Sequence, residues 1–302
     1  MSIEVSINNF DMSQFDHLAA LFGSYFEPND KLLTRDYTEW LYARNPFGPA
    51  KMVKAVQGDR WIGIMAMIPV QLVRHDARLV AYYVVNVLVH PQYQGKHIFG
   101  RLITAAKELV KVENAVLMGH PNDMALKQWQ RSRMNFHEAL KPSLVLPKLF
   151  SKGANARDVQ DAKQLDSVLP ALQAQAQQAD RWNIAVTHEY INWRYLERPA
   201  NTYRLQLIEV DGVPAGFVVS KKVRIGISLL VDQFMLDQHV SDGLSRLPWF
   251  TVSFKPESST RELSKSLWLL PFKKQIPFFF THYQQSFSIR DVMNLGLSAS
   301  DF

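Results

Sequence analysis

Two stretches of this chain resemble each other at a fixed separation. Residues 33–46 read LTRDYTEWLYARNP and residues 186–199 read VTHEYINWRYLERP, with five identities in fourteen positions. The identical residues are a threonine, two tyrosines, a tryptophan and a proline, which suit a short helix followed by a turn. Further along, Gly63 and Gly216 keep the same separation. Similarity at one constant separation predicts that the chain folds as two copies of one unit.

The first copy contains a strand, a glycine-containing loop and an amphipathic helix in succession. Residues 84–89 form an apolar, β-branched run that is typical of a buried strand, and Pro91 ends it. The loop QGKHIFG follows at residues 94–100, and apolar residues then recur at helical spacing as far as Val112. The first amide groups of a helix have no partner within the helix, and the helix dipole adds partial positive charge there. This order therefore predicts an anion site, which Gly95 lets the backbone approach closely.

This stretch resembles motif A of the GCN5-related N-acetyltransferases (GNAT). In that family a Gln/Arg-x-x-Gly-x-Gly/Ala loop binds the pyrophosphate of acetyl-coenzyme A. Gln94 fits the first position, whereas His97 and Phe99 stand where the two glycines are expected. A common extended form of the motif is matched at Pro91, Tyr93, Gly95 and Lys96.

The resemblance and the repeat together imply a mixed α/β (α+β) fold. We expect two acyl-CoA N-acyltransferase-like (GNAT) domains, each with a central mixed sheet flanked by helices. Residues 1–150 would form the domain with the CoA-binding loop, residues 151–180 a linker and a helix, and residues 181–302 a second, degenerate copy. The second copy carries LDQHVSDG at residues 236–243, and its two carboxylates would repel a pyrophosphate.

Local patterns predict the elements of the two copies. In the first copy we expect helices over residues 13–26, 34–42 and from 122 to about 134, and strands over residues 52–56, 61–67, 70–73, 79–89, 115–119, 135–136 and 144–146. In the second half we expect a helix over residues 171–179 and one or two aromatic-rich strands within residues 267–287.

The resemblance also implies which residues hold the cofactor. The strand before the loop would hold the pantetheine arm through the backbone of Val87, Leu88 and Val89. The loop would hold the pyrophosphate through Gln94, Gly95, Lys96, His97, Ile98, Phe99, Gly100 and Arg101. Asn122, at the start of the next helix, would contact the pantetheine arm.

The catalytic side chains follow a different pattern from that of the family. Transfer of an acyl group from a thioester to an amine requires a polarised carbonyl, loss of a proton from the amine and protonation of the thiolate. The family often places a carboxylate where this chain has Asn86, and a tyrosine close to Trp129. His120 is the remaining acid/base candidate, because histidine titrates near neutral pH. The alternative is a half-buried histidine that forms hydrogen bonds near a helix start.

Composition excludes several other classes of site. The chain has no cysteine, which excludes disulfides, thiolate metal sites and a cysteine nucleophile. The formal net charge is +6, with 17 basic and 13 acidic side chains in residues 1–150, so the excess is too diffuse to predict a nucleic-acid partner. The start MSIEVSINNF lacks the pattern of a signal peptide, and no apolar run is long enough to span a membrane. We expect a cytoplasmic protein with no metal, no membrane partner and no nucleic-acid partner.

The sequence therefore predicts an acyl-CoA-dependent N-acyltransferase with its active site in the first copy. The donor would be acetyl-CoA or another acyl-CoA, and the acceptor an amine of a small molecule or sugar that attacks the thioester directly. Two alternatives stay open. One is an acyl-CoA-binding module without catalysis, and the other is a tandem-copy transferase that takes its acyl group from aminoacyl-tRNA. The acceptor, the acyl length and the oligomeric state are not predicted.

Overall fold

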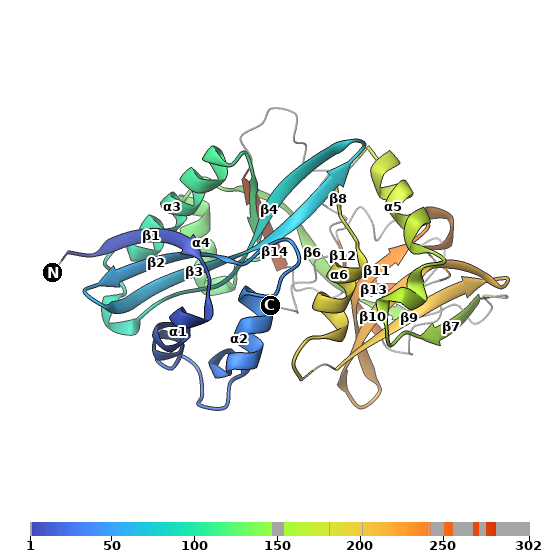
Figure 1. Ribbon diagram of the computed structural model, residues 1–302, viewed down its shortest axis with the longest axis horizontal. Helices are drawn as coiled ribbons and strands as arrows, with labels where there is room; N and C mark the ends of the chain where they lie inside the picture. The colour runs from blue at the N-terminus through green and yellow to red at the C-terminus, as the bar shows by residue number, and fades with distance from the viewer. Residues whose placement is uncertain are drawn as a thin grey trace.

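The computed structural model describes residues 2–146, 154–180, 182–200, 202–240, 242, 251–255, 268–271 and 276–281 (Figure 1). Its first half contains β1 (Glu4–Asn9), α1 (Phe15–Phe22), α2 (Arg35–Tyr42), β2 (Lys51–Gln57), β3 (Arg60–Arg74), β4 (Ala77–Val89), α3 (Ile98–Val112), β5 (Val116–Gly119), α4 (Asp123–Arg131) and β6 (Asn135–Leu146). Short 3₁₀ turns, η1 (Met12–Gln14), η2 (Lys31–Leu33) and η3 (Pro91–Tyr93), join some of these elements.

The second half repeats much of this order. It contains β7 (Ala154–Asp158), η4 (Ala162–Leu165), α5 (Leu169–Gln178), β8 (Asn183–Ile184), α6 (His188–Ile191), a π-helical turn η5 (Asn192–Leu196), β9 (Tyr203–Val210), β10 (Val213–Arg224), β11 (Ile227–Met235), η6 (Asp237–His239), β12 (Thr251–Lys255), β13 (Trp268–Pro271) and β14 (Ile276–Thr281).

The strands form two mixed sheets that share one strand. The first sheet has the order β1-β2-β3-β4-β5-β14-β6, and the second has the order β7-β9-β10-β11-β12-β6, with β13 also paired to β6. β4 runs parallel to β5, and β11 runs parallel to β12. The two sheets therefore have the same strand order and the same parallel pair, which confirms the mixed α/β fold class predicted from the sequence.

Each half completes its sheet with a strand from the other half. β6 pairs with β14 through residues 135–140 and with β12 through residues 141–145. β14 returns to the first sheet and lies between β5 and β6. The predicted division into residues 1–150, 151–180 and 181–302 stays a prediction. The sheets cross it, because residues 276–281 belong to the first sheet and residues 154–158 to the second.

Apolar residues are buried on both faces of the first sheet. α3 and α4 cover one face, where Leu102, Val110 and Trp129 belong to a cluster that also includes Phe279 of β14. α1 and α2 cover the opposite face, as Figure 1 shows at the lower left. The cluster on that face continues through α5 and α6 into the second half, so the two halves share one hydrophobic core.

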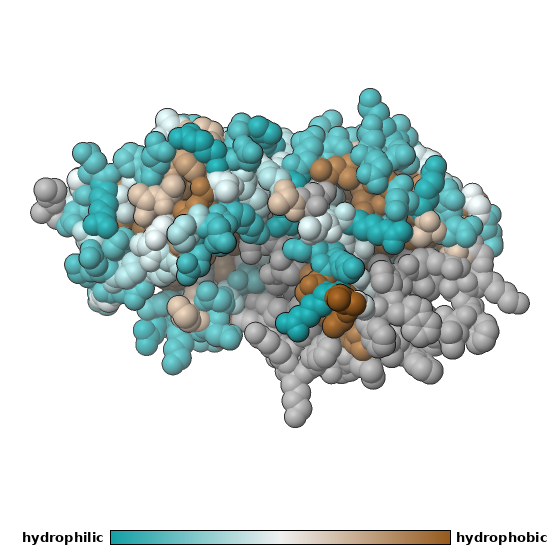
Figure 2. All heavy atoms as spheres, turned by 90° about the horizontal axis from the view of Figure 1, so that it is seen from below, coloured by the Kyte–Doolittle hydropathy of each residue, from teal (hydrophilic) through white to brown (hydrophobic). Residues whose placement is uncertain are grey.

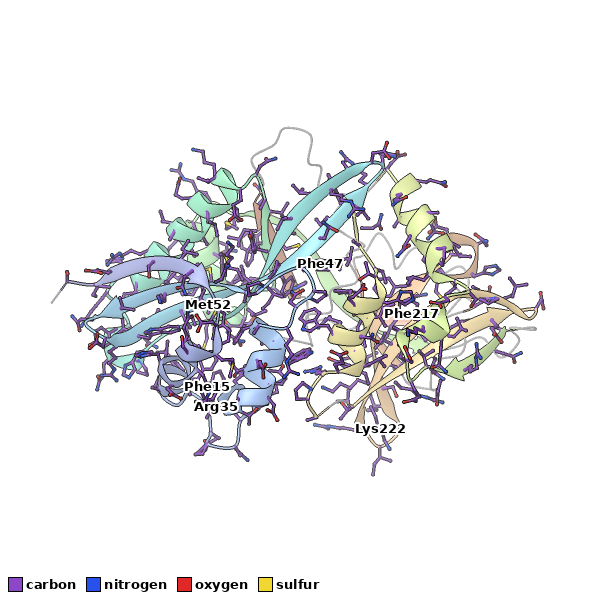
Figure 3. The ribbon with its side chains drawn as sticks, viewed as in Figure 1. Phe15, Arg35, Phe47, Met52, Phe217 and Lys222 are labelled. Atoms are coloured by element: carbon purple, nitrogen blue, oxygen red, sulfur yellow. The ribbon has the colours of Figure 1, made fainter. Side chains whose placement is uncertain are left out.

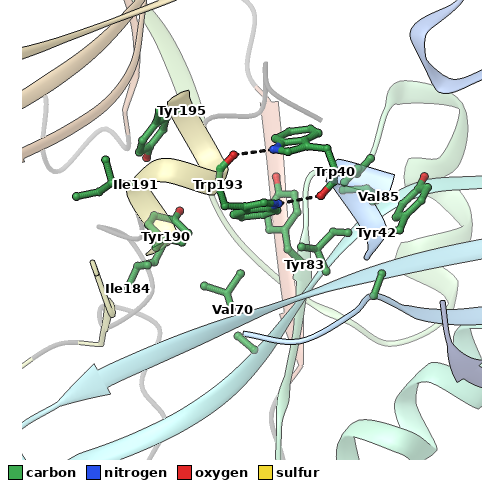
Figure 4. Packing of buried hydrophobic residues seen from close by; sticks show 14 of the residues in the cluster. Trp40, Tyr42, Val70, Tyr83, Val85, Ile184, Tyr190, Ile191, Trp193 and Tyr195 are labelled. Carbon is green, nitrogen blue, oxygen red and sulfur yellow. Dashed lines mark hydrogen bonds between the residues drawn. The ribbon is translucent and has the colours of Figure 1, made fainter. Parts of the chain in front are cut away.

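Helix α2 and the repeated helical segment formed by α6 and η5 contact each other at the centre of this shared core. The indole Nε1 of Trp40 donates to the carbonyl of Trp193 at 2.6 Å, and the Nε1 of Trp193 donates to the carbonyl of Trp40 at 2.8 Å (Figure 4). The two rings stack with centroids 5.6 Å apart. Phe47 stacks on Tyr190 at 5.7 Å, and Figure 3 shows Phe47 between the two halves. The residues that reveal the repeat in the sequence thus form the contact between the copies.

Several predicted elements differ from the observed ones. Residues 61–67 and 70–73 belong to one strand, β3, and residues 135–136 and 144–146 belong to one strand, β6. The first helix is shorter than predicted, since the chain leaves it after Phe22. β1 and β7 were not predicted. Of the predicted aromatic strands within residues 267–287, residues 272–275 and 282–287 lie outside the described residues.

In the part of the chain that the structure describes, no helix is both long enough and apolar enough to cross a membrane.

Candidate functional site

The two parallel strands of the first sheet separate at one end. β4 and β5 pair through residues 81–83 and 116–118. β4 then continues to Val89, whereas β5 ends at Gly119, so residues 84–89 have no pairing with β5. A Cβ on Gly119 would lie 3.3 Å from the carbonyl oxygen of Val84, so the strands are close where the separation begins. The backbone of Val87 and Leu88, predicted to hold the pantetheine arm, lies on this separated end.

A bulge at Asn86 accompanies the separation of the strands. Asn86 has a φ of 48°, in the left-handed region that asparagine tolerates better than most residues. Its Nδ2 donates to the hydroxyl of Tyr42 at 2.6 Å. Burial raises the pKa of Tyr42 well above its ordinary value, so this hydroxyl stays protonated. Asn86 thus fixes the bend of β4 and is held by α2, which places it on the face opposite α3.

Tyr25 links the end of β4 to the loop. Its hydroxyl donates to the carbonyl of Val89 and accepts a 2.7 Å hydrogen bond from the side chain of Gln94. The carbonyl of Val89 therefore already accepts a hydrogen bond within the chain, whereas a residue that holds the pantetheine arm is expected to have its backbone groups available to the ligand. Gly95 follows with a φ of 78°, and a Cβ added there would meet no atom within 4 Å. The loop is consequently open toward solvent at Gly95.

The structure explains how histidine replaces the first glycine of the motif. His97 is the N-cap of α3 and has a φ of 56°, the left-handed conformation that glycine usually supplies. Its side chain makes no capping hydrogen bond, so the first amide groups of the helix face the loop. Gly100 lies in the first turn, where an added Cβ would also meet no atom within 4 Å. The backbone at the start of α3 is therefore accessible to an anion.

Two loop residues point into the core and not toward the opening. Ile98 is buried beneath α3. Phe99 meets the edge of Trp129, with ring centroids 5.8 Å apart. Trp129 in turn stacks on Phe279 of β14 at 4.0 Å. Trp129 is thus a packing residue between α4 and the sheet, and its indole is fully enclosed.

Basic side chains surround an open pocket beside α3. The pocket has a volume of about 600 Å³ and is lined by His97, Gly100, Arg101, Thr104, Lys107 and Arg131, among others. Arg101 donates to the carbonyl of Ile3 at 2.9 Å, which ties β1 to the start of the helix. Lys107 donates to the carbonyl of Ser132 at 3.0 Å. The Lys96 ammonium lies over the ring of Tyr93 at 4.6 Å. This concentration of cations at one helix favours a ligand with several phosphates.

His120 follows β5 and contacts the neighbouring strand. Its Nδ1 forms a 2.5 Å hydrogen bond with the hydroxyl of Tyr83 on β4. Burial lowers the pKa of His120 to about 3, so the imidazole is neutral at physiological pH. The next helix begins at Asn122, whose Oδ1 accepts from the amide of Ala125 at 2.8 Å. The predicted acid/base residue is therefore a neutral ring held by a tyrosine, and Asn122 acts as a helix cap.

The structure thus groups the predicted residues into three places. Residues 87–89 and His120 lie at the separated ends of β4 and β5, whereas the exposed loop residues lie at the start of α3. Ile98 lies in the core, and Phe99 is half-buried against it. Sequence reasoning did not single out Tyr25 or Tyr42, which connect these places. Tyr42 carried a usable signal, because it belongs to the internal repeat. Tyr25 carried none, since its contacts are with residues far along the chain.

The second copy keeps the strand separation but changes its surroundings. β11 pairs with β12 through residues 228–230 and continues to Met235. The predicted loop at residues 236–243 contains the short turn η6, and residues 243–250 lie outside the described part. The hydroxyl of Tyr195 donates to Asp232 at 2.8 Å. This contact corresponds to the contact between Tyr42 and Asn86 in the first copy. Buried Arg194 lies 4.0 Å from the same carboxylate.

Within the residues that the structure describes, no group of three or more histidine, aspartate or glutamate side chains could hold a metal ion.

Comparison with known proteins connects this geometry to a family. Residues 6–126 match a family profile described as an acetyltransferase (GNAT) domain. No curated protein matches the chain in sequence.

Solved structures match the chain over nearly its whole length. A probable N-acyltransferase of unknown function from Enterococcus faecalis V583 is 11% identical, with a TM-score of 0.66, over 93% of this chain and 73% of that one. A putative acetyltransferase from Pyrococcus horikoshii is 9% identical, with a TM-score of 0.59, over 99% and 96% of the two chains. A tandem GNAT protein from the clavulanic acid biosynthesis pathway is 12% identical, with a TM-score of 0.53, over 93% and 98%.

At these identities the solved structures establish a shared fold, and the family profile adds the acetyltransferase domain in the first copy. The loop at Gly95 and the separated strands β4 and β5 all lie within the residues that match this profile. The resemblance seen in the sequence is confirmed for the first copy: residues 6–126 match the acetyltransferase (GNAT) domain profile, and the chain as a whole shares the fold of solved structures described as GNAT N-acetyltransferases.

Proposed function

We propose that this acetyltransferase takes its acyl group from acetyl-CoA, or from another acyl-CoA, and transfers it to an amine of a small molecule or sugar. The observation that carries the proposal is the separated end of β4 and β5 beside the open start of α3. The unpaired strand edge suits an extended pantetheine arm. The exposed helix amides, together with Lys96 and Arg101, suit a pyrophosphate.

The chemistry requires a balanced transfer at the thioester. The amine nitrogen forms a bond to the acyl carbon, the carbon–sulfur bond breaks, the amine loses a proton and the thiolate gains one. The residues of this chain supply binding and orientation at the mouth of the opening, where the loop backbone neutralises the phosphate charge.

Binding of CoA is expected to depend on the charge of the loop at residues 95 and 96. The double variant Gly95→Asp/Lys96→Glu places two negative charges beside the pyrophosphate. We expect it to bind CoA at least about tenfold more weakly than the matched variant Gly95→Asn/Lys96→Gln, a difference of about 1.4 kcal/mol. Asparagine and aspartate tolerate the left-handed backbone of Gly95 equally, so the two variants differ in charge alone. Isothermal titration with CoA and acetyl-CoA measures the difference.

The salt dependence and the stoichiometry add two checks on this proposal. High salt should reduce the difference between the two variants, because the repulsion acts through solvent. One site per chain is expected, whereas two sites would mean that the second copy also binds CoA. If the unmodified protein ignores CoA but binds tRNA with a steep salt dependence, the donor is aminoacyl-tRNA and the proposal is wrong.

The geometry at His120 favours a hydrogen-bond donor over a general base. A phenol is more acidic than a neutral imidazole, so Tyr83 is the natural donor in their shared hydrogen bond. Nδ1 of His120 then accepts, and its proton is on Nε2. A base at this position would need a free ring nitrogen and a pKa near neutrality. Tyr83 is therefore a positioning residue that selects the tautomer of His120.

A nitrogen-15 NMR titration of histidine-labelled protein is expected to show this tautomer directly. The signal that disappears in His120→Gln should stay neutral, with the proton on Nε2, from pH 8 down to about pH 4, because the pKa is about 3. Tyr83→Phe should change the tautomer of His120 but should not move the pKa of His120 to a value near 6.5. The other eight histidines serve as internal references. Protonation of His120 near pH 6.5 would restore the general-base assignment.

A second function has specific support and is kept as the alternative. Asn86 replaces the expected carboxylate and is bound to Tyr42, while Trp129 is packed in the core. Both observations suit a module that binds acyl-CoA without catalysis. CoA binding without release of free thiol across a broad panel of amines would favour this alternative over the transferase.

A further inference from the structure

The hairpin between β10 and β11 exposes apolar side chains at its tip. Ile225, in the turn itself, is 96% exposed, and Val223 and Ile227 on either side are 56% and 40% exposed. A turn is ordinarily built from polar residues or glycine, and only Gly226 fits that pattern here. Three exposed aliphatic side chains in five residues are therefore unusual for a loop that contacts water alone.

Basic side chains lie among these apolar residues. Lys222 and Arg224 alternate with Val223 and Ile225 along the hairpin, and both cations are exposed. Residues 220–228 read SKKVRIGIS, so the tip carries no acidic residue. Figure 3 labels Lys222 at the lower end of the second half. Figure 2, which views the molecule from below, shows hydrophobic and hydrophilic side chains next to each other on this face.

The first copy packs other segments of the chain beside the base of its equivalent hairpin tip, although residues 75–78 at the tip itself are exposed. β2 pairs with β3 only as far as Met67. Further along the same edge of β3, β8 pairs with Leu72 and Val73. The guanidinium of Arg74 lies over the ring of Trp182, 4.8 Å from its centroid. The turn that follows is polar, His75–Asp76. In this copy other segments of the chain therefore pack against residues 72–74, and the exposed turn beyond them is polar.

The second copy shows no such packing beside its tip among the described residues. β9 pairs with β10 as far as Lys221, and the hairpin continues beyond that pair as far as Arg224 and Ile227. Polar residues of the first tip are replaced by isoleucine and glycine. The difference between the two copies points to a contact outside the chain, because a tip without a contact would gain nothing from aliphatic residues.

We propose that the tip of the β10–β11 hairpin, residues 222–227, docks on an anionic lipid surface. The apolar side chains would enter the boundary between head groups and acyl chains, and Lys222 and Arg224 would pair with lipid phosphates. A stable protein partner normally buries about 800 Å² on each side, which is far more than three aliphatic side chains offer. Pairing of two identical tips would bring like charges together. The observed charge and size therefore favour a lipid surface.

This proposal differs from the expectation of no membrane partner. That expectation followed from the lack of a long apolar run, which concerns segments that span a bilayer. A short tip that touches the surface needs no such run, because interleaved apolar and basic side chains are sufficient for reversible binding. The hairpin belongs to the second copy, away from the loop at Gly95, so docking does not depend on the proposed function of the first copy.

Sedimentation of the full chain with lipid vesicles tests the proposal. We expect binding to phosphatidylcholine vesicles that contain phosphatidylglycerol, at least tenfold weaker binding to pure phosphatidylcholine, and release by high salt. Ile225→Ser and Lys222→Gln/Arg224→Gln should each weaken binding to the anionic vesicles at least fivefold. Both changes affect exposed side chains, so the fold should be retained, as circular dichroism can verify.

Matched controls separate docking from general stickiness or general charge. Val213→Ser removes an apolar side chain, 65% exposed, at the other end of β10 and should leave binding unchanged. Lys111→Gln/Lys127→Gln removes the same amount of charge from the first half and should also leave it unchanged. Equal losses in a control and its matched tip variant would overturn the proposal. So would a lack of vesicle binding, or a concentration-dependent dimer that Ile225→Ser abolishes.

Discussion

Asp232→Asn is expected to lower the free energy of unfolding by about 3–5 kcal/mol, because it leaves the guanidinium of Arg194 buried without its carboxylate. Arg194 is 1% exposed and Asp232 is 3% exposed, and their closest atoms are 4.0 Å apart. The hydroxyl of Tyr195 donates to the same carboxylate at 2.8 Å, and an asparagine could still accept that bond. The loss therefore measures the removal of the carboxylate charge beside Arg194 and not the missing hydrogen bond.

The first copy supplies the variant that should rescue this loss. Leu41 aligns with Arg194 in the repeat, and Asn86 is the third residue before the end of β4, as Asp232 is before the end of β11. The double variant Arg194→Leu/Asp232→Asn thus restores the uncharged pair of the first copy. We expect it to unfold within about 1 kcal/mol of the unmodified protein, since a buried ion pair contributes little beyond an apolar replacement.

Urea denaturation followed by circular dichroism measures these differences, and an exposed ion pair provides the comparison. Arg35 and Asp16 are 3.0 Å apart with side chains 58% and 82% exposed, so Asp16→Asn should cost less than about 1 kcal/mol. A double variant that is no more stable than Asp232→Asn alone would show that the two charges do not compensate each other. In that case Arg194 and Asp232 would have separate partners.

The two-copy architecture could be predicted from the sequence because its signal is local. The threonine caps a short helical segment in each copy, and the tryptophan and tyrosines lie within that segment. Helix α2 begins and ends within one residue of the prediction. The loop at Gly95 was recognisable for the same reason. The left-handed conformation of His97 could not be read from the sequence, since histidine adopts that region only when its surroundings impose it.

The division of β3 into two strands was wrong for a physical reason. Pro69 lies in the middle of β3 and lacks an amide donor, a property that by itself argues against a continuous strand. The pairing of β2 with β3 ends at Met67, and no ladder bond from Pro69 to β2 is needed. Pro69 stands opposite Tyr82 of β4, and its carbonyl accepts a 2.7 Å hydrogen bond from Nδ2 of Asn45. Whether a proline is tolerated inside a strand thus depends on where the neighbouring strands end, which the local sequence does not reveal.

Other features of the site depend on contacts between distant residues. Tyr83 and His120 meet because β4 and β5 run parallel across a helical connection, and Tyr25 reaches Val89 from the loop after α1. The exchange of β6 and β14 between the sheets is equally non-local. β1 was different, because Ile3, Val5 and Ile7 alternate with polar residues and gave a strand signal that the interpretation overlooked.

The last prediction concerns the paired tryptophans that join the copies. Trp193→Ala is expected to lower the free energy of unfolding by about 3–5 kcal/mol, because it removes a buried ring and leaves a cavity in the shared core. Trp193→Phe should cost about 1–3 kcal/mol, since it keeps most of the packing but leaves the carbonyl of Trp40 without its donor.

Hydrogen exchange distinguishes a contact between copies from packing within one copy. Trp193 and Trp40 exchange hydrogen bonds between their indole rings and backbone carbonyls. Trp193→Ala should therefore accelerate amide exchange in α2 of the other copy as well as in α6 and η5. Trp61→Ala, a buried tryptophan of the first half, should destabilise its own sheet without an early effect on α6. Unchanged exchange in α2 would mean that the exchanged strands β6 and β14 hold the copies together and that the tryptophans fill space only. Faster exchange in both helices would mean that the repeat persists in the sequence because the two copies need each other at this contact.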